Sequence, residues 1–413
     1  MIEDIGRQAK AASREIARLG TTEKNEILSH IGESLVAREE EILSANALDL
    51  EKGKESGLSE ALMDRLLLNE DRILQMKEGL LKVASLDDPI GEIFEMKTMP
   101  NGLKIGKKRV PLGVVGIIYE SRPNVTIDTA ALCLKSSNAL ILRGGSEAIE
   151  SNKVLVSIIQ DVLMDRGHDK NMVQLIEDLS YETAGKFMKM NEYLDVLIPR
   201  GSAKLIQRVV KEATVPVIET GVGNCHVYVD DSADFNMALN IIVNAKTQRT
   251  GVCNAMESLL VNEKIAKEFL PEFKVVMDEH HVTVKADQKA REIEQGFKIA
   301  TEEDYATEFL DLIMSLKIVS DYKEAIAHIN KFGTGHSEVI ITESYDHAME
   351  FLDEVDAAAV YVNASTRFTD GSEFGMGAEM GISTQKLHAR GPVGLKELTT
   401  IKYIIFGQGQ VRK

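Results

Sequence analysis

The sequence has few cysteines and no long apolar run. Its 413 residues include three cysteines, Cys133, Cys225 and Cys253, whose spacing fits neither a disulfide framework nor a zinc site. No apolar run approaches the roughly 20 residues of a membrane-spanning helix, and the first twenty residues resemble an amphipathic helix more than a signal peptide. We therefore expect a cytoplasmic protein without a metal site or membrane contact, in which at least one thiol is free for chemistry.

Positive charge is also scarce. The chain carries 48 Lys and Arg residues against 65 Asp and Glu residues, which gives a formal net charge of −17. A surface of this sign repels the phosphates of nucleic acids and of anionic membranes. We expect neither as a partner, and an anionic ligand would need a local cluster of basic side chains.

The arrangement of apolar residues predicts an α/β protein of two or three domains. The first ninety residues carry apolar residues at helical spacing. From 113 to 230, and again from 226 to 363, short β-branched runs such as ALILRGG (139–145) and VPVIET (215–220) alternate with helical stretches. This alternation predicts two doubly wound parallel sheets.

Two other segments have strand character without helices between them. IFEMKTMPNGLKIGKKRV (93–110) alternates on both sides of Asn101-Gly102, which is a strong hairpin signal. TTIKYIIFGQGQV (399–411) lies at the C-terminus. Two interpretations stay open: strand addition to a neighbouring subunit, or an edge strand within the chain.

Polar residues follow several predicted strands, at the edge where parallel sheets bind ligands and helix N-termini bind phosphate. Arg143 suits the ribose side or the 2′-phosphate of NADP, whereas Gly201 and Ser202 open a helix and suit a pyrophosphate. No GxGxxG follows the first strand, so ordinary strand-to-helix turns are the alternative at these positions. Glu219 ends the VPVIET segment, where it is either functional or a solvated charge.

Asn124 and Cys253 are the candidates for chemistry. Asn124 stands between a strand and a helix, where its amide could donate to an oxyanion or simply cap the helix. Cysteines are usually buried, but Cys253 lies in TQRTGVCNAMES (247–258), a polar turn. We expect Cys133 to be core, Cys225 to be structural, and a turn at a helix N-terminus to lower the pKa of Cys253.

The segment 363–394 is a long loop rich in Gly, Ser and Thr, and long ordered loops usually hold function. It carries Arg367, His388 and Arg390 as local positive charges. They are candidates for binding an anionic substrate, the alternative being surface residues without a role.

Five segments together resemble the aldehyde dehydrogenase superfamily: VPLGVVGIIYESRPNVT, LILRGGSEA, VPVIETGVGNCHVYVD, AKTQRTGVCNAMESLLV and STRFTDGSEFGMGAEMGISTQKLHARGPVGL. The last three are most similar to the branch that reduces L-glutamyl 5-phosphate. The resemblance implies that Cys253 is the nucleophile and that Asn124 helps to form the oxyanion hole. It places Glu219 where hydrolytic relatives keep a general base, and Arg143, Gly201 and Ser202 at the cofactor.

The resemblance also implies a domain organisation. An NADP-binding domain would comprise residues 1–92, 109–222 and 383–397, and a catalytic domain residues 223–382. Residues 93–108 and 398–413 would form an oligomerisation element of a dimer or tetramer.

The implied reaction is the NADPH-dependent reduction of L-glutamyl 5-phosphate to glutamate 5-semialdehyde and phosphate through a cysteine thioester, the second step of proline biosynthesis. Association with glutamate 5-kinase stays open. One alternative is a hydrolytic NAD(P)-dependent aldehyde dehydrogenase. Another is a non-redox cysteine acyltransferase or hydrolase, for which His226 or His388 would have to assist the thiol.

Overall fold

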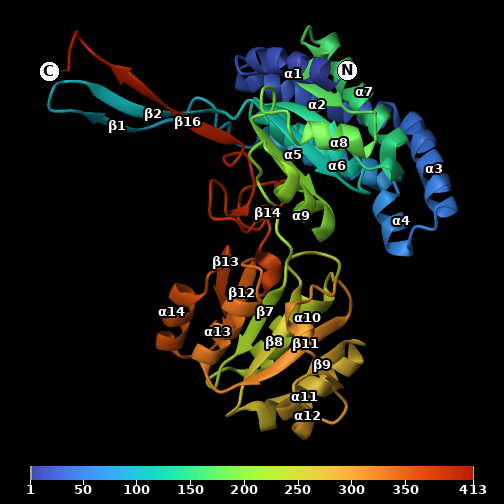
Figure 1. The fold of residues 1–413 in the computed structure, drawn as a ribbon, viewed down its shortest axis with the longest axis vertical. Coiled ribbons are helices and arrows are strands. Elements are labelled where there is room, and N and C mark those ends of the chain that lie inside the picture. Colours follow the sequence, from blue (N-terminus) through green and yellow to red (C-terminus); the bar gives the residue numbers. More distant parts are fainter. Residues whose placement is uncertain (1, 413) are drawn as a thin grey trace. The chain divides into compact units, whose positions relative to one another are not determined.

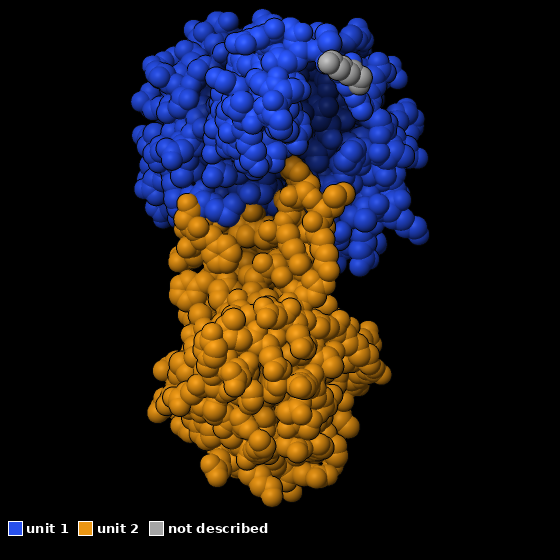
Figure 2. Space-filling view, turned by 90° about the vertical axis from the view of Figure 1, so that its left-hand side faces the viewer, with its two compact units in different colours: residues 1–220, 376–381, 393–413 blue, residues 221–375, 382–392 orange. Residues whose placement is uncertain are grey.

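A computed structural model describes residues 2–412, which fall into two compact units. Unit 1 comprises Met1–Thr220, Met376–Gly381 and Val393–Lys413, and unit 2 comprises Gly221–Gly375 and Ile382–Pro392 (Figure 2). Within residues 2–412, no helix combines the length and the apolar character needed to cross a membrane. The assignment of cofactor and catalytic domains concerns function and stays a prediction.

Helices dominate the first ninety residues, as their apolar spacing predicts. These helices are α1 (Ile2–Ile16), α2 (Thr21–Ala37), α3 (Glu39–Glu55), α4 (Glu60–Leu66) and α5 (Glu70–Ser85). Polar side chains cap two of them, since Ser59 accepts a hydrogen bond from Leu62 N at the start of α4 and Asn69 accepts one from Arg72 N at the start of α5. Their apolar stripes are buried within unit 1, and α2 packs along α5 and α7.

A parallel sheet of order β5-β4-β3-β6 forms the centre of unit 1. Its strands are β3 (Val114–Tyr119), β4 (Ala139–Arg143), β5 (Val173–Leu175) and β6 (Val196–Arg200). The connecting helices are α6 (Asn124–Lys135), η1 (Ser146–Ala148), α7 (Ile149–Asp165), η2 (Lys170–Met172), α8 (Tyr181–Phe187) and α9 (Ala203–Glu212). Every residue of β3 is buried, which explains its continuous apolar sequence.

The strand order brings the loops after β3 and β6 together. Because β3 lies between β4 and β6, the winding of the sheet reverses at this point, where α/β sheets commonly bind ligands. Ser202 N, after β6, donates to the Glu120 carboxylate, after β3, at 2.8 Å. The residues that follow β3 and β6 therefore lie side by side.

The expectation of a regular strand at VPVIET was wrong. Only an isolated bridge between Val217 and Leu197 forms there. Leu197 N donates to Pro216 O at 2.8 Å and Ile218 N donates to Leu197 O at 3.0 Å. Pro216 has no N–H, so it cannot continue the ladder.

A second parallel sheet, of order β10-β9-β11-β8-β7-β12-β13, forms unit 2 (Figure 1). Its strands are β7 (Cys225–Val229), β8 (Met256–Asn262), β9 (Thr283–Ala286), β10 (Lys298–Ile299), β11 (Ile313–Val319), β12 (Ser337–Ile341) and β13 (Ala359–Val362). Its helices are α10 (Phe235–Thr247), α11 (Ala266–Glu279), α12 (Gln288–Ile293), η3 (Glu303–Ala306), α13 (Tyr322–Phe332), α14 (Tyr345–Glu354) and η4 (Thr366–Phe368). Apolar clusters cover both faces of the sheet. A short antiparallel pair, β14 (Ile382–Ser383) and β15 (Gly391–Pro392), belongs to the same unit.

The predicted hairpin is present and extends from the body of unit 1 (Figure 1). Strands β1 (Ile93–Thr98) and β2 (Lys104–Pro111) flank the turn, where Gly102 has φ +85°. The C-terminal strand β16 (Thr399–Phe406) pairs with β2 along its full length, so the order is β1-β2-β16. Strand β16 is therefore an edge strand within the chain, and its contact with a neighbouring subunit stays a prediction.

A buried ion pair joins α10 to β8 on either side of the Cys253 turn. Lys246 Nζ lies 2.6 Å from Glu257 Oε2, and both side chains are fully buried. Glu257 Oε1 also accepts a hydrogen bond from Leu310 N at 3.1 Å. Burial raises the pKa of Glu257 to about 7 and lowers the pKa of Lys246. Each charged group therefore depends on the other to offset its loss of hydration.

Replacing Lys246 with Met should destabilise unit 2 by about 3–5 kcal/mol, because it leaves a buried carboxyl group without its cation. The measurement is the thermal unfolding midpoint of the variant. A Lys246→Met/Glu257→Gln double variant is the matched control, since the amide keeps an acceptor for Leu310 N without a charge. The double variant should unfold at a higher temperature than the single one, and equal losses would contradict this account.

Candidate active site

Cys253 lies in the turn that leads from α10 into β8. It is half-buried, whereas Cys133 and Cys225 are fully buried. The expectation of a helix N-terminus at the thiol was wrong, because α10 ends before the turn and a strand follows it.

The rear of the turn is fixed by the residues that precede β7. The Cys225 thiol donates to Cys253 O at an Sγ–O distance of 3.2 Å, and burial raises the pKa of Cys225, so it stays a neutral donor. A Cβ atom at Gly223 would overlap the same carbonyl group, so only glycine allows this approach. Gly223 N donates to Glu308 Oε1 at 2.8 Å. Cys253 is thus backed by packed, hydrogen-bonded atoms.

The other side of the turn is held by η4 and the residues after it. Asn254 Nδ2 donates to Thr369 O at 2.9 Å, and Thr366 Oγ1 donates to Asn254 O at 2.7 Å. Arg367, in the same short helix, donates through Nε to Gln248 Oε1 at 2.9 Å. Burial and the neighbouring Arg249 guanidinium lower the pKa of Arg367. Two guanidinium groups therefore lie beside the Cys253 turn, which suits an anion.

The other two predicted substrate-binding residues lie farther along the same loop. Arg390 Nη2 lies 2.7 Å from Asp356 Oδ1, and Lys386 Nζ lies 2.5 Å from the other oxygen of this carboxylate. His388 has a positive φ of +68°. Arg367 is thus hydrogen-bonded to the Cys253 turn, whereas Arg390 forms an ion pair with Asp356.

Asn124 is the first residue of α6 and does not use its side chain as a cap. Its Nδ2 donates to Asp128 Oδ2, one helical turn on, at 2.9 Å. A carboxylate only accepts, so this contact fixes the orientation of the amide and leaves its second N–H for another acceptor. That orientation agrees with an oxyanion donor better than with a helix cap.

Arg143 ends β4 in an environment that fits a phosphorylated cofactor. Its Nη2 donates to Leu179 O at 2.8 Å, but its Nε is buried without a hydrogen-bond partner within residues 2–412. Burial lowers its pKa, and so does the nearby Arg208 guanidinium, which lies 5.0 Å from the centre of the Tyr181 ring. An unsatisfied donor beside a second guanidinium suits the 2′-phosphate of NADP.

Gly201 and Ser202 immediately precede α9, at the start of a helix as predicted. Ser202 Oγ accepts from Leu205 N at 3.4 Å, which caps the helix. Ser202 N is engaged with Glu120, so this helix N-terminus already holds one anion of the chain itself. A pyrophosphate here would have to share the N-terminus with that carboxylate.

Glu219 is half-buried in the irregular segment between α9 and β7. Thr220, beside it, donates through Oγ1 to Pro199 O at 2.7 Å, which ties the segment to β6. Unit 1 ends at Thr220 and unit 2 begins at Gly221. Glu219 therefore belongs to the last residues of unit 1 before the chain passes into unit 2.

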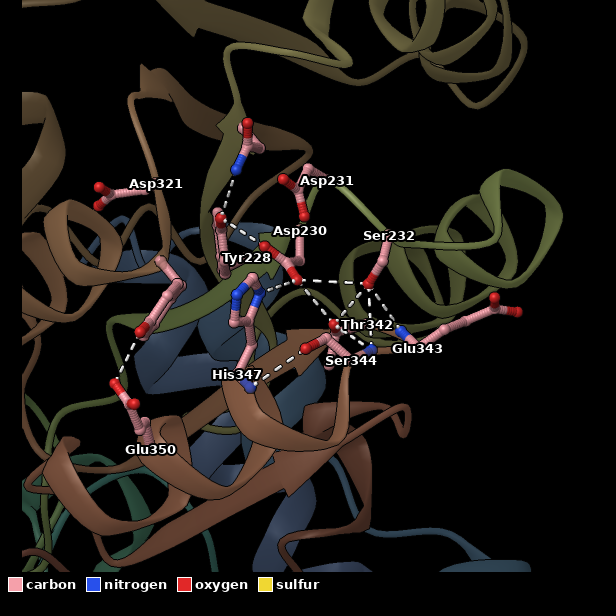
Figure 3. A network of polar contacts seen from close by, with 12 residues as sticks. Tyr228, Asp230, Asp231, Ser232, Asp321, Thr342, Glu343, Ser344, His347 and Glu350 are labelled. Carbon is pink, nitrogen blue, oxygen red and sulfur yellow. Dashed lines mark hydrogen bonds and ion pairs between the residues drawn. The ribbon is translucent and has the colours of Figure 1, made fainter.

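A second polar network lies at the opposite edge of the unit 2 sheet, where β7 and β12 end (Figure 3). Buried Asp230 accepts hydrogen bonds from Tyr228, Thr342 and His347 at 2.9, 2.7 and 2.7 Å. Burial raises the pKa of Asp230, but these bonds outweigh it and leave the pKa below its usual value. Ligand atoms of Asp230, Asp231 and His347 lie within 4.8 Å of one another. Because three hydrogen-bond donors already surround the Asp230 carboxylate, we assign this network a role in stabilising the fold.

Comparison with known proteins shows the family. Residues 1–296 and 298–404 match the aldehyde dehydrogenase family. The chain belongs to this family. It is 60% identical over 407 residues to the γ-glutamyl phosphate reductase of Heliobacterium modesticaldum, covering 98% of both chains. The crystal structure of γ-glutamyl phosphate reductase from Thermotoga maritima matches with a TM-score of 0.98 at 50% identity, covering 99% of both chains.

A more distant structure shows the same fold. An acetylating aldehyde dehydrogenase from Geobacillus thermoglucosidasius matches with a TM-score of 0.68 at 20% identity, covering 100% of this chain and 97% of that one. The predicted aldehyde-dehydrogenase-like fold, with two parallel sheets and a small antiparallel one, is therefore confirmed.

Sequence reasoning missed several residues that shape these sites. Asp128 could have been found, because it follows Asn124 at the i+4 spacing that places two side chains on one helix face. Arg208 lies within α9 and gives no signal of its proximity to Arg143. Thr366 and Gly223 support the Cys253 turn from distant parts of the sequence, so only the fold reveals them.

Iodoacetamide should label Cys253 well before Cys133 and Cys225. The reagent reaches only the half-exposed thiol, and burial raises the pKa of both other cysteines. Peptide mass mapping after a short exposure to limiting reagent measures the three sites separately. A Cys253→Ala variant, labelled in parallel, shows the background, and equal labelling of all three cysteines would contradict the assignment.

Proposed function

We propose that the chain is an oxidoreductase of the aldehyde dehydrogenase family that reduces L-glutamyl 5-phosphate to glutamate 5-semialdehyde with NADPH, the second step of proline biosynthesis. The observation that carries the proposal is the half-exposed Cys253, in a turn fixed from both sides and beside two guanidinium groups. A fixed nucleophile beside cations suits an acyl phosphate. The similarity to γ-glutamyl phosphate reductases supports a glutamyl group as the acyl group.

The proposed first step is acyl transfer to sulfur. The Cys253 thiolate attacks the C5 carbonyl carbon, a C–S bond forms, and the bond from C5 to the phosphate oxygen breaks. Inorganic phosphate leaves with the electron pair. Neighbouring guanidinium groups favour the thiolate, and Arg367 is our candidate for holding the phosphate. His388 and Arg390 stay candidates for the substrate α-carboxylate.

The proposed second step reduces the thioester. When bound, NADPH supplies a hydride to the thioester carbon, and the main-chain N–H of Cys253 and the Asn124 amide are the donors that we assign to the resulting oxyanion. The C–S bond then breaks, so that Cys253 is released as a thiolate with the aldehyde. Arg143, joined by Arg208, is assigned to the 2′-phosphate of the cofactor, and Gly201 and Ser202 are assigned to its pyrophosphate.

We also propose that the antiparallel sheet binds a second copy of the chain in a dimer or tetramer. Within residues 2–412, strand β16 has one neighbouring strand, β2, so its outer edge presents backbone groups that can pair with another strand. Its apolar side chains are unusually exposed, for example Tyr403 at 63% and Ile405 at 60%. An exposed apolar edge of this kind is typical of a subunit contact.

Two alternative activities remain to be distinguished. A hydrolytic aldehyde dehydrogenase would use the same cysteine with water as the acyl acceptor. A non-redox acyltransferase would need a histidine beside the thiol. His226 is fully buried and donates through Nδ1 to Glu338 at 2.9 Å, which disfavours its recruitment.

Phosphate should be required for reduction of NADP by the chain with glutamate 5-semialdehyde as substrate, because phosphate is the acyl acceptor in the reverse direction. NADPH absorbance measures this rate with and without phosphate. Cys253→Ala should lose all activity while still shifting NADPH fluorescence on binding. Equal rates without phosphate would favour the hydrolytic alternative, and absence of NADPH binding would favour the acyltransferase.

Glu219→Gln should retain most of the reductive activity. A general base that activates water would hydrolyse the thioester before hydride reached it, so we assign Glu219 a structural or positioning role. The steady-state rate of NADPH oxidation with the acyl phosphate measures the effect. A loss of several orders of magnitude in a folded variant would show that Glu219 acts in the chemistry.

A further inference from the structure

Asp128 has an unusual environment for a carboxylate. It lines a small cavity of about 70 Å³ in unit 1, together with residues of α5, α6 and the segment 376–381. The other lining residues are mostly apolar or lack a side chain: Gly79, Leu80, Val83, Ile127, Ala131, Leu132, Ala378 and Glu379. Gly79 leaves space at this carboxylate, since even a Cβ atom there would lie 4.0 Å from Asp128 Oδ1. The cavity therefore gives a ligand access to Asp128.

The chain itself provides little compensation for this charge. Among residues 2–412, Asn124 is the one hydrogen-bond donor to the carboxylate, and no Lys, Arg or His side chain forms an ion pair with it. Burial raises the pKa of Asp128 to about 6. The hydrogen bond from Asn124 and the positive charge of Arg200 oppose this rise but do not cancel it. Asp128 is half-buried, and a carboxylate that is partly withdrawn from water without a paired cation is destabilised. A cationic group of a ligand in the cavity would offset that cost.

The positions of Asn124 and Asp128 suit the two ends of the proposed substrate. Asn124 Nδ2 and Asp128 Oδ2 lie 2.9 Å apart on one face of α6. An acceptor at the second N–H of Asn124 and a donor at Asp128 Oδ1 each add a hydrogen-bond length of about 2.9 Å, so the two ligand atoms would lie farther apart than the side-chain atoms themselves. In L-glutamyl 5-phosphate, four bonds of about 1.5 Å separate the reacting carbonyl carbon from the α-ammonium nitrogen, a reach of about 5 Å. One substrate molecule can therefore reach both groups, with its oxyanion at Asn124 and its ammonium group at Asp128.

We propose that Asp128 binds the α-ammonium group of the substrate and thereby selects an amino-acid acyl phosphate over an acyl phosphate of the same length without the amino group. The inference rests on the proposed function and adds a specificity residue to it. It requires no covalent step, because an N–H of the ammonium group donates to Asp128 Oδ1 while Oδ2 keeps the bond from Asn124.

The test compares two aldehydes in the phosphate-dependent reverse reaction: glutamate 5-semialdehyde and 5-oxopentanoate, which has the same chain and carboxylate but no amino group. The readout is the ratio of the two kcat/KM values. Loss of a charge-assisted hydrogen bond in Asp128→Asn should shift this ratio about ten- to one-hundred-fold toward 5-oxopentanoate. Because Asn124 serves both substrates, any disturbance of its orientation cancels in the ratio.

Glu379→Gln is the matched control, since it neutralises the other carboxylate that lines the cavity and should leave the ratio unchanged. An unchanged ratio in Asp128→Asn would overturn the inference and leave Asp128 only as a support for Asn124. A ratio that moves in Glu379→Gln but not in Asp128→Asn would overturn it as well. Failure of the proposed function is distinguishable, because wild-type turnover of glutamate 5-semialdehyde would then not depend on phosphate.

Discussion

The geometry of the candidate active site depends on the close approach of residues 223–225, which lead into β7, to the main chain of Cys253. Gly223 lies against the Cys253 carbonyl group, and the Cys225 thiol donates to the same oxygen. Two β strands that are neighbours in the sheet thus bring a glycine and a buried thiol behind the nucleophile. On the other side, Thr366 Oγ1 donates to Asn254 O and Asn254 Nδ2 donates to Thr369 O, which fastens the turn to η4 and the residue after it. A turn fastened in this way can hold a thiol in one orientation without a regular helix or strand of its own.

Charged groups at the candidate sites differ in how far the chain compensates them. Lys246 and Glu257 form a buried ion pair on either side of the Cys253 turn. Within residues 2–412, Arg143 keeps a buried Nε without a hydrogen-bond partner, and Asp128 forms no ion pair with a Lys, Arg or His side chain. Buried polar groups are usually satisfied, so incomplete ones point to ligands. The cationic position suits a phosphate and the anionic one suits an ammonium group, in agreement with the proposed cofactor and substrate.

The two edges of the unit 2 sheet have different roles. At the carboxyl ends of β7 and β12, Asp230 is enclosed by hydrogen-bond donors and forms a closed network. At the amino ends of β7 and β8 lie Cys225, Gly223 and the Cys253 turn. Parallel sheets usually bind ligands at their carboxyl ends, and in unit 2 this rule leads away from the candidate nucleophile. In unit 1, Arg143, Gly201 and Ser202 lie at the carboxyl ends of β4 and β6.

Much of the architecture could be predicted from the sequence, because it follows from local pattern. The apolar spacing predicted the N-terminal helices, the β-branched runs predicted both parallel sheets, and Asn101-Gly102 predicted the hairpin. Local pattern also singled out Cys253, since a cysteine among turn-forming residues is easily recognised. It failed at Pro216, where one missing N–H prevents a regular strand, and at the start of the Cys253 turn, where a helix ends instead of beginning.

The sequence by itself determined the elements, the two sheets and the exposed thiol, because each depends on residues that are neighbours along the chain. Only the tertiary structure decided which groups surround that thiol and which charges remain uncompensated. Gly223, Thr366 and Arg208 come from segments far from the residues that they support, and Asp128 is distinguished by the cavity beside it. A charged side chain loses its hydration only when distant segments pack around it. The free-energy cost of burying that charge therefore depends on the fold and cannot be read from the sequence.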